Sequence, residues 1–394
     1  MKILHVIPTI ALEHGGPSHG VRMMATACAA RGLEVEVAAT SFGTPQGHED
    51  PRRVWTYEEQ AVRYRLFPRV TGSGWNLSLP LTRWLYASAG HYDVLHVHAP
   101  FSYPSLAACS AARYRRVPYV YRTLGTMDPW SLRHRAWKKW PYYQLLEKRN
   151  LRAAAVVHVT SEMERQALDD LGFGARTCAI GYGVQLPRAV QRSASETLRI
   201  LFIGRLHPIK GLPVLLDAVA KLPDMSGRAW RLDIGGGGDD AHRAELEAQA
   251  RSLGIAARVR FFGFVHGDEK ARLLADSDVF VLPSHHENFG LAALEAMGVG
   301  LPAVVSDGVA LSSEIDAAGA GIRFRDGDAG GLAAALGRYL DPTVRARAGE
   351  RARGLVQERF TVEAMAGALE RMYRGAAGRA VTTSDAAGTS ARGR

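Results

Sequence analysis

Short runs of apolar and β-branched residues alternate along this chain with longer segments of helical periodicity. The runs expected to form buried strands are residues 3–7, 33–39, 62–67, 94–98, 119–122, 154–159 and 176–180, then 198–203, 230–234, 259–262, 279–282 and 303–306. Helical patterns lie between them, among them residues 18–30, 79–88, 105–113, 132–150 and 213–220. Such alternation predicts parallel sheets covered by helices, and therefore an α/β protein.

The alternation stops once and then restarts. Residues 181–197 contain Gly, Pro and Ser with little periodicity, as a linker does. At 394 residues the chain is also too long for one ordinary core. We therefore expect two doubly wound, Rossmann-like domains facing across a cleft. Their expected extents are 1–185 and 186–360, followed by a helix over 361–375 that packs back toward the N-terminal domain and a disordered tail over 376–394.

Two carboxylates, Glu287 and Glu295, follow the expected strand 279–282. The order there is strand, short polar loop and helix, with the amides of residues 288–291 expected to open the helix without partners inside it. Such a helix end attracts phosphate. A ligand with hydroxyls and phosphates, such as a nucleotide sugar, fits this pattern. A solvated loop Glu and a favourable partner for the helix dipole explain the two carboxylates equally well.

Arg205 and Lys210 lie five positions apart in the loop after the expected strand 198–203. Arg offers a fork to phosphate oxygens and Lys a point charge, so the pair can flank one diphosphate. Fixed cations would stabilise the charge that grows on a departing diphosphate without a metal. Either residue alone is explained as well by an ordinary polar surface loop.

The first half of the chain offers glycines and a histidine at comparable places. Gly15 and Gly16 follow the first strand and let backbone approach a ligand, although they do not form a GxGxxG fingerprint. His98 ends the strand 94–98, at the sheet edge where α/β proteins bind ligands. His96 shares its face but lies deeper and is expected to be a packed histidine.

The net charge of +10 is concentrated in one stretch. Residues 113–152 contain eleven Lys or Arg against Asp128 and Glu147. Interfacial aromatics accompany them, which indicates contact with an anionic membrane surface. A solvated helix face is the alternative, and no nucleic-acid-binding motif is present. The expected contact residues are Trp130, Arg135, Trp137, Lys138, Lys139 and Trp140.

The sequence argues against a membrane-spanning protein, a secreted disulfide-stabilised protein and a metalloprotein. No apolar run approaches the roughly 20 residues of a membrane span, and the N-terminus does not resemble a signal peptide. Three cysteines without a CxxC pattern fit a reducing cytosol. No His, Cys or carboxylate cluster has metal spacing. Asp276-Ser277-Asp278 looks like a DxD metal motif, but it lies at the start of a buried strand, which is the wrong end.

Taken in order, three segments resemble GT-B glycosyltransferases of family 4. They are Gly15-Gly16, Gly204-Arg205-Leu206 with Lys210-Gly211, and Glu287-Asn288-Phe289-Gly290 through Glu295-Ala296-Met297. The resemblance covers almost the whole chain except the tail. It implies a retaining transfer of a hexose-type sugar from a UDP- or GDP-sugar, with no metal and no other cofactor.

The resemblance also implies individual roles. Glu287 and His98 would contact the reacting sugar, Glu287 as a positioning group. Glu295 would bind the ribose hydroxyls, and Arg205 and Lys210 the diphosphate. The backbone of Asn288, Phe289, Gly290 and Leu291 would contact sugar and phosphates, and Gly15 and Gly16 would approach the phosphates.

Residues 121–152 are similar to bacterial members that build exopolysaccharide or lipopolysaccharide on lipid-linked sugars. This similarity implies a cytoplasmic enzyme held at the inner face of the plasma membrane, with a nucleotide sugar and a lipid-linked saccharide as partners and no nucleic acid. A transferase with a soluble acceptor, a catalytically silent nucleotide-sugar binder and a GT-B epimerase remain open alternatives.

Overall fold

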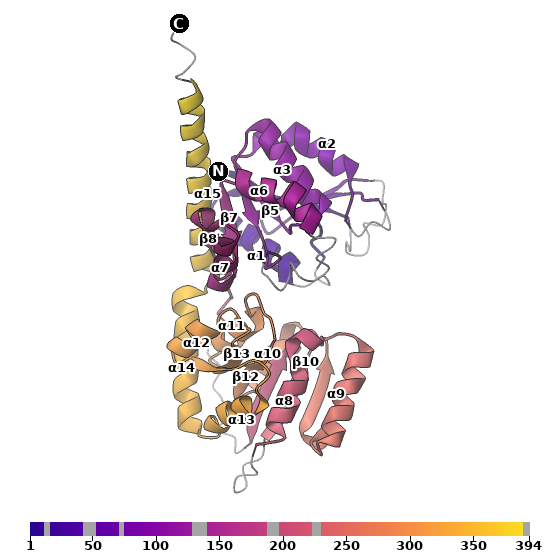
Figure 1. The fold of residues 1–394 in the computed structure, drawn as a ribbon, viewed down its shortest axis with the longest axis vertical. Helices are drawn as coiled ribbons and strands as arrows, with labels where there is room; N and C mark the ends of the chain where they lie inside the picture. The colour runs from indigo at the N-terminus through magenta and orange to yellow at the C-terminus, as the bar shows by residue number, and fades with distance from the viewer. Residues whose placement is uncertain are drawn as a thin grey trace. The chain divides into compact units, whose positions relative to one another are not determined.

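The chain forms two compact units, shown in the computed structural model in Figure 1. One comprises Met1–Gly183 and Val362–Arg394, and the other Val184–Thr361. The structure describes residues 1–11, 16–41, 53–70, 75–127, 140–186, 197–222 and 230–388, with backbone alone for 379–388. The last helix, α15 (Val362–Gly388), therefore returns to the N-terminal unit.

Among the described residues, the N-terminal unit has an eight-stranded sheet in the order β3-β4-β2-β1-β5-β6-β7-β8. All neighbours are parallel except the pair β3 and β4. The strands are β1 (Lys2–Val6), β2 (Glu34–Thr40), β3 (Trp55–Glu59), β4 (Val62–Phe67), β5 (Val94–His98), β6 (Tyr119–Arg122), β7 (Val156–Val159) and β8 (Thr177–Ala179). The helices besides α15 are α1 (Gly16–Ala30), α2 (Leu79–Ser88), α3 (Tyr103–Arg115), a π-helical turn (Tyr143–Glu147), α6 (Lys148–Ala153) and α7 (Glu162–Asp170).

Among the described residues, the C-terminal unit has a six-stranded, wholly parallel sheet in the order β11-β10-β9-β12-β13-β14. This is the strand order of a Rossmann fold. The strands are β9 (Leu198–Ile203), β10 (Trp230–Gly235), β11 (Val259–Gly263), β12 (Val279–Leu282), β13 (Ala303–Ser306) and β14 (Gly321–Phe324). The helices are α8 (Leu212–Val219), α9 (Asp240–Ser252), α10 (Gly267–Ala275), α11 (Leu291–Gly298), α12 (Ser312–Ala317), α13 (Ala329–Arg338) and α14 (Pro342–Arg359). The predicted pair of parallel-sheet, Rossmann-like domains is confirmed.

Each sheet reverses its strand order at one point. In the N-terminal unit the reversal falls between β1 and β5, and in the C-terminal unit between β9 and β12. Ligands of open α/β sheets bind outside the carboxyl ends of the strands that flank such a reversal. The loops after these four strands are therefore the places where the fold puts chemistry.

Strand β3 is an element that the sequence pattern missed, since no strand was expected between the runs 33–39 and 62–67. Its residues are mostly exposed at the edge of the sheet, so they carry no apolar run. The turn to β4 is made by Gln60 and Ala61, both at positive φ (50° and 61°). Hairpin turns of this kind usually contain Asn or Gly, so the usual turn signal was absent too.

Helix α15 continues to Gly388, so the prediction of a disordered chain from residue 376 is wrong as far as 388. Residues 389–394 lie outside the described part. The helix packs on α1, and its Leu369, Tyr373 and Ala376 are fully buried in the core that α1 and the sheet share. The composition of the tail gave no sign of this, because Ala, Gly, Ser and Thr form no apolar stripe there.

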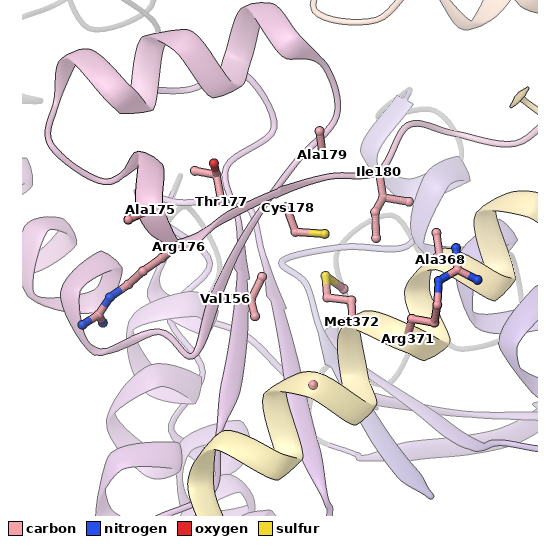
Figure 2. Close-up of a pocket in the computed structure, with 11 residues that line it drawn as sticks. Val156, Ala175, Arg176, Thr177, Cys178, Ala179, Ile180, Ala368, Arg371 and Met372 are labelled. Atoms are coloured by element: carbon pink, nitrogen blue, oxygen red, sulfur yellow. The ribbon is translucent and has the colours of Figure 1, made fainter. Parts of the chain in front are cut away.

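A hollow of about 510 Å³ lies between β8 and α15 (Figure 2). Cys178 of β8 and Met372 of α15 face each other across it, and Ile180 also lines it. None of the residues expected to bind substrate lines it. It is a gap beside the edge strand, away from the point where the strand order reverses.

Candidate functional site

The strand-order reversal of the C-terminal unit brings Lys210 and Glu287 together. Lys210 belongs to the loop after β9 and Glu287 to the loop after β12, and their side chains form an ion pair. The two side chains are 17% and 21% exposed, so the pair is partly buried and solvent still reaches it. The backbone joins the same loops, since the His285 amide donates to the Ile209 carbonyl over 2.9 Å. Sequence reasoning had put both residues at this sheet edge without expecting them to touch.

Close backbone packing fixes the geometry of these loops. Gly211 has φ +65°, and a Cβ there would lie 2.0 Å from the carbonyl oxygen of Pro283. Only glycine fits such a position. On the other side, the Glu287 amide donates to Gly308 over 2.9 Å and the Glu287 carbonyl accepts from Ala310 over 3.0 Å. The backbone of Glu287 is thus held on both sides, which preorganises its carboxylate.

The segment after Glu287 differs from the prediction in one respect. Helix α11 begins at Leu291, with Gly290 in the left-handed region at φ +89° as the residue before it. Asn288, Phe289 and Gly290 therefore precede the helix and do not open it. The Phe289 side chain is buried and meets the ring of Phe360 edge-on at 6.2 Å, so only its backbone is placed to meet a ligand.

Glu295 lies in the second turn of α11 and pairs with Lys270 of α10 at 2.6 Å. Their side chains are 31% and 27% exposed. Sequence reasoning missed Lys270, because it lies 25 residues from Glu295 in a different helix and belongs to no pattern around it. The pair places a second cation next to the carboxylate expected to bind ribose.

Arg205 is exposed in the same loop as Lys210, which begins where Gly204 donates to Gly235 over 2.9 Å. The local field is positive: partial burial lowers the pKa of His207, and the charges of Arg205, His242 and Lys210 lower it further. Asp278, by contrast, is bound by Arg199 through two contacts of 2.9 and 3.0 Å at the start of β12. That pairing gives Asp278 a structural role at the opposite end of the strand.

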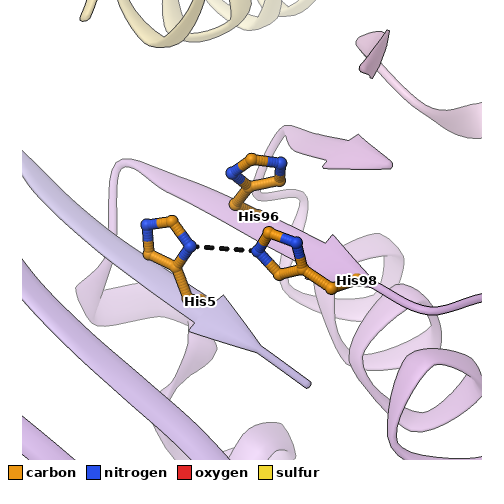
Figure 3. Close-up of side chains that lie close together, drawn as sticks. All are labelled: His5, His96 and His98. Carbon is orange, nitrogen blue, oxygen red and sulfur yellow. Dashed lines mark hydrogen bonds between the residues drawn. The ribbon is translucent and has the colours of Figure 1, made fainter. Parts of the chain in front are cut away.

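In the N-terminal unit, Gly16 is the exposed first residue of α1, two residues before the predicted helix start, and Gly15 lies outside the described residues. His98 ends β5, as predicted, but its side chain is fully buried. Its Nε2 lies 3.0 Å from Nδ1 of His5 on the neighbouring strand β1 (Figure 3). Its Nδ1 is buried with no hydrogen-bond partner among the described residues.

Arg122 ends the neighbouring strand β6, where it is the register partner of His98. Its side chain is 1% exposed, and its guanidinium lies 4.6 Å from the ring centre of Tyr182. Within the described part of the chain, its Nε and Nη1 atoms have no hydrogen-bond partner. Sequence reasoning had counted Arg122 among the surface charges of residues 113–152, and its burial removes it from that set.

One ring nitrogen from each of His5, His96 and His98 lies within 4.8 Å of the other two, close enough for a metal site. Two observations weigh against that use of the rings. Both nitrogens of His5 and both of His96 already have hydrogen-bond partners. In addition, burial lowers the pKa values of all three imidazoles, and the charge of Arg122 lowers them further; that charge also disfavours a metal cation.

Each half of the chain matches a model of a known protein family. Residues 15–183 match the family model for a glycosyl transferase 4-like domain, and residues 185–355 match glycosyl transferases group 1. The chain is also 31% identical over 307 residues to a D-inositol 3-phosphate glycosyltransferase of Corynebacterium jeikeium, covering 72% of each chain. The chain belongs to the group 1 glycosyltransferases.

Solved structures show the same GT-B fold at low identity. The Anabaena protein Alr3699/HepE, solved in complex with UDP and glucose, superposes with a TM-score of 0.71 at 21% identity, covering 94% of this glycosyltransferase and 99% of that protein. WaaG, a glycosyltransferase involved in lipopolysaccharide biosynthesis, superposes with a TM-score of 0.68 at 17% identity, covering 93% and 98%.

The segment of this glycosyltransferase expected to meet a membrane or acceptor lies mostly outside the described residues. That holds for Trp130, Arg135, Trp137, Lys138 and Lys139. Trp140 is described and is 52% exposed, with its ring 5.6 Å from that of Tyr143. Among the described residues, every helix falls short of the length and apolarity that a membrane span needs. Membrane contact through this segment stays a prediction.

Proposed function

We propose that this glycosyltransferase moves a hexose from a UDP- or GDP-sugar to a lipid-linked saccharide, with retention of configuration and without a metal. The observation that supports this best is the Lys210–Glu287 ion pair where the C-terminal sheet reverses, with Glu295 on the helix that follows. A cation beside a carboxylate suits a substrate in which phosphates and sugar hydroxyls are adjacent.

The proposed roles follow from the chemistry of each group. Lys210 and Arg205 take the diphosphate, and Lys210 exchanges its contact with Glu287 for one with phosphate. Glu287 then accepts hydrogen bonds from sugar hydroxyls, while Glu295 accepts those of the ribose. As the bond from the anomeric carbon to the phosphate oxygen breaks, the two cations stabilise the charge that collects on that oxygen.

Retention is proposed to come from attack on the same face of the sugar. The acceptor oxygen bonds to the anomeric carbon as the diphosphate departs, and the acceptor proton passes to the departing phosphate oxygen. Glu287 positions the sugar through hydrogen bonds in this scheme and forms no covalent bond to it. In this scheme the protein stabilises the charge on the departing diphosphate and orients the sugar. The loops that carry Lys210 and Glu287 are proposed to do both.

The proposed acceptor rests on the basic and aromatic residues 113–152 and on the fold shared with WaaG. It implies an enzyme at the inner face of the plasma membrane. A soluble acceptor is the second candidate, because a relative with 31% identity is named for D-inositol 3-phosphate. The two candidates differ in whether the enzyme needs a lipid surface.

The donor class can be tested by thermal shift with UDP, GDP and ADP. A ligand at a hundred times its Kd adds about 2.7 kcal/mol to stability, and UDP or GDP is expected to raise Tm by several degrees. EDTA should leave the shift unchanged, and Lys210→Ala should reduce it, because Arg205 still binds the diphosphate. A shift with ADP alone, or with none of the three, would contradict the proposed donor, and a shift lost in EDTA would contradict metal independence. Binding without transfer to any acceptor would favour the silent binder.

The membrane part of the proposal has its own test in vesicle flotation. We expect the enzyme to float with vesicles that contain anionic lipid, but not with neutral ones, at physiological salt. The double variant Lys138→Glu/Lys139→Glu is expected to stay unbound, while Lys221→Glu, an exposed Lys of the C-terminal unit, should float like the wild type. An enzyme that stays unbound at physiological salt, yet still transfers sugar, would favour the soluble acceptor.

A further inference from the structure

Hydrogen bonds connect four buried histidines of the N-terminal unit to helix α15. Nε2 of His158 lies 2.8 Å from the carbonyl oxygen of Ile180, and its Nδ1 lies 3.1 Å from Nε2 of His96. Nδ1 of His96 in turn lies 2.8 Å from the hydroxyl of Tyr373 on α15. These four groups come from β7, the segment after β8, β5 and α15, and all four residues lie in the core.

The same hydroxyl continues the series toward His98. The Tyr373 oxygen lies 3.5 Å from Nε2 of His5, and Nδ1 of His5 lies 3.0 Å from Nε2 of His98. The far nitrogen of His98, Nδ1, is buried and has no partner among the described residues. We call this series, from the Ile180 carbonyl to Nδ1 of His98, the histidine chain.

All four imidazoles of the histidine chain are neutral at physiological pH. Burial, and then the charge of Arg122, lowers the pKa of His5 to about 3. Burial also lowers the pKa values of His96, His98 and His158 well below their usual range, and Arg122 adds to the effect on each. A neutral imidazole has one N–H and one bare nitrogen, so each ring can donate once and accept once.

The donor and the acceptor of every hydrogen bond in the histidine chain then follow from the Ile180 end. A carbonyl oxygen can only accept, so His158 has its proton on Nε2 and a bare Nδ1. That bare Nδ1 must accept from His96, which leaves Nδ1 of His96 to accept from the Tyr373 hydroxyl. The hydroxyl has then used its only proton.

The second half of the histidine chain is directed in the same way. The Tyr373 oxygen can now only accept, and a bare Nε2 of His5 facing it would set two lone pairs against each other. His5 therefore has its proton on Nε2, and its Nδ1 accepts from Nε2 of His98. What remains at the carboxyl end of β5 is a bare Nδ1 on His98.

We propose that the histidine chain fixes His98 as a hydrogen-bond acceptor for a substrate hydroxyl, with Tyr373 as the positioning residue that sets its tautomer from α15. The identity of the hydroxyl as one of the sugar substrates rests on the proposed function. Arg122, the register partner of His98, offers unpaired N–H groups at the same sheet edge. A hydroxyl can donate to Nδ1 and accept from a guanidinium, and so satisfies both kinds of unpaired atom.

This assignment makes a chemical distinction. A bare Nδ1 attracts a hydroxyl and repels an oxygen that has no proton, such as a carbonyl or a fully ionised phosphate. His98 therefore selects for the hydroxyl of a sugar and against its oxidised or deoxygenated analogues. Tyr373 acts on this selection through His5, which lies between it and His98, and does not need to touch the substrate.

The test is the tautomer of His98 itself, observed by ¹⁵N NMR of histidine-labelled enzyme and assigned with His98→Gln. We expect a single Nε2–H form in the wild type. Tyr373→Phe removes the bonds to His96 and His5, and since one neutral hydrogen bond is worth about 1 kcal/mol, the preference should fall about fivefold. The Nδ1–H form of His98 then becomes visible, and transfer is expected to fall in proportion to the fraction of enzyme that has lost the Nε2–H form.

Tyr119→Phe is the matched control. Its hydroxyl is also buried in this unit, but it donates to the Asn150 carbonyl and belongs to no part of the histidine chain. It should lower stability and leave the His98 tautomer unchanged. An Nδ1–H form in the wild type would overturn the proposal, and so would a tautomer that Tyr373→Phe does not change. The wild-type spectrum suffices if that variant does not fold.

The readout separates this proposal from the proposed function. The tautomer is measured without substrate, so it stands or falls independently of sugar transfer. If no nucleotide raises the Tm of the wild type while His98 shows the Nε2–H form, the proposed donor is wrong and the histidine chain stands. If UDP or GDP raises Tm and His98 shows the Nδ1–H form, the reverse holds.

Discussion

Lys210→Ala is expected to lower the kcat of sugar transfer by about 10²- to 10³-fold, the usual loss when one preorganised donor to a developing charge is removed. Lys210 is the cation that the fold brings to the carboxylate of Glu287. A hydrogen bond of 2.9 Å from the His285 amide to the Ile209 carbonyl joins the two loops that carry them. Its removal leaves no other cation known to pair with Glu287 among the described residues. The measurement is kcat at saturating donor, with Tm followed to show that the fold is retained.

Three variants make this result interpretable. Lys221→Ala removes an exposed Lys of the same unit and should transfer sugar at the wild-type rate. Glu287→Ala should also lower kcat strongly, because the sugar loses its positioning group. The double variant should lose less than the two single losses multiplied, since the residues act as a unit. Unchanged kcat in Lys210→Ala would remove Lys210 from the proposed mechanism.

The buried strands were the part of the fold that the sequence predicted most closely. β5 and β12 have the predicted bounds, since runs such as Val279–Leu282 are apolar throughout and are buried on both faces. Exposed elements were harder: β3 has no apolar run, and the end of α15 has no apolar stripe. Burial leaves a pattern in the sequence, whereas a solvated edge strand or helix end leaves almost none.

The candidate site was predictable only as positions along the chain. Glu287 and His98 could be placed at the carboxyl ends of strands, because strand order and loop position follow from the βαβ pattern. Their partners could not. Lys210 is 77 residues from Glu287, and Tyr373 is 277 residues from His96, so each contact depends on how whole elements pack.

The histidine chain shows this most clearly. Three of its histidines, His5, His96 and His158, lie in buried strands. From the sequence alone, a histidine in such a strand is interpreted as a packing residue. Nothing near them in the sequence indicates that they are bonded in series. The register that pairs His5 with His96 and His98 with Arg122 is a property of the folded sheet alone.

Acidification is expected to unfold the N-terminal unit steeply, at about 4–5 kcal/mol per pH unit below roughly pH 6. In the folded unit the pKa of His5 is lowered to about 3, and those of the other three chain histidines lie well below 6.5. The unfolded chain binds a proton on each of the four near pH 6.5, and the folded unit does not. Stability is therefore fully present above pH 6.5 and is lost as pH falls toward 3.

Glu147 acts in the opposite direction, because burial raises its pKa in the folded unit. There the folded unit binds at most one proton that the unfolded chain does not. The net uptake on unfolding is thus three to four protons, at about 1.4 kcal/mol per proton and pH unit. A domain with the usual 5–15 kcal/mol of stability would then unfold between about pH 3 and 5.5. Few single surface substitutions change stability by as much as one pH unit does here.

Tryptophan fluorescence can follow the N-terminal unit selectively. Of the seven tryptophans, only Trp230 belongs to the C-terminal unit, so urea unfolding of Trp230→Phe at pH 7, 6 and 5 reports on the unit of interest. His91→Gln removes an exposed histidine of the same unit and should keep the full slope. Equal stability at pH 7 and pH 5 would mean that the four buried histidines are not held neutral, and the direction assigned to the histidine chain would lose its basis.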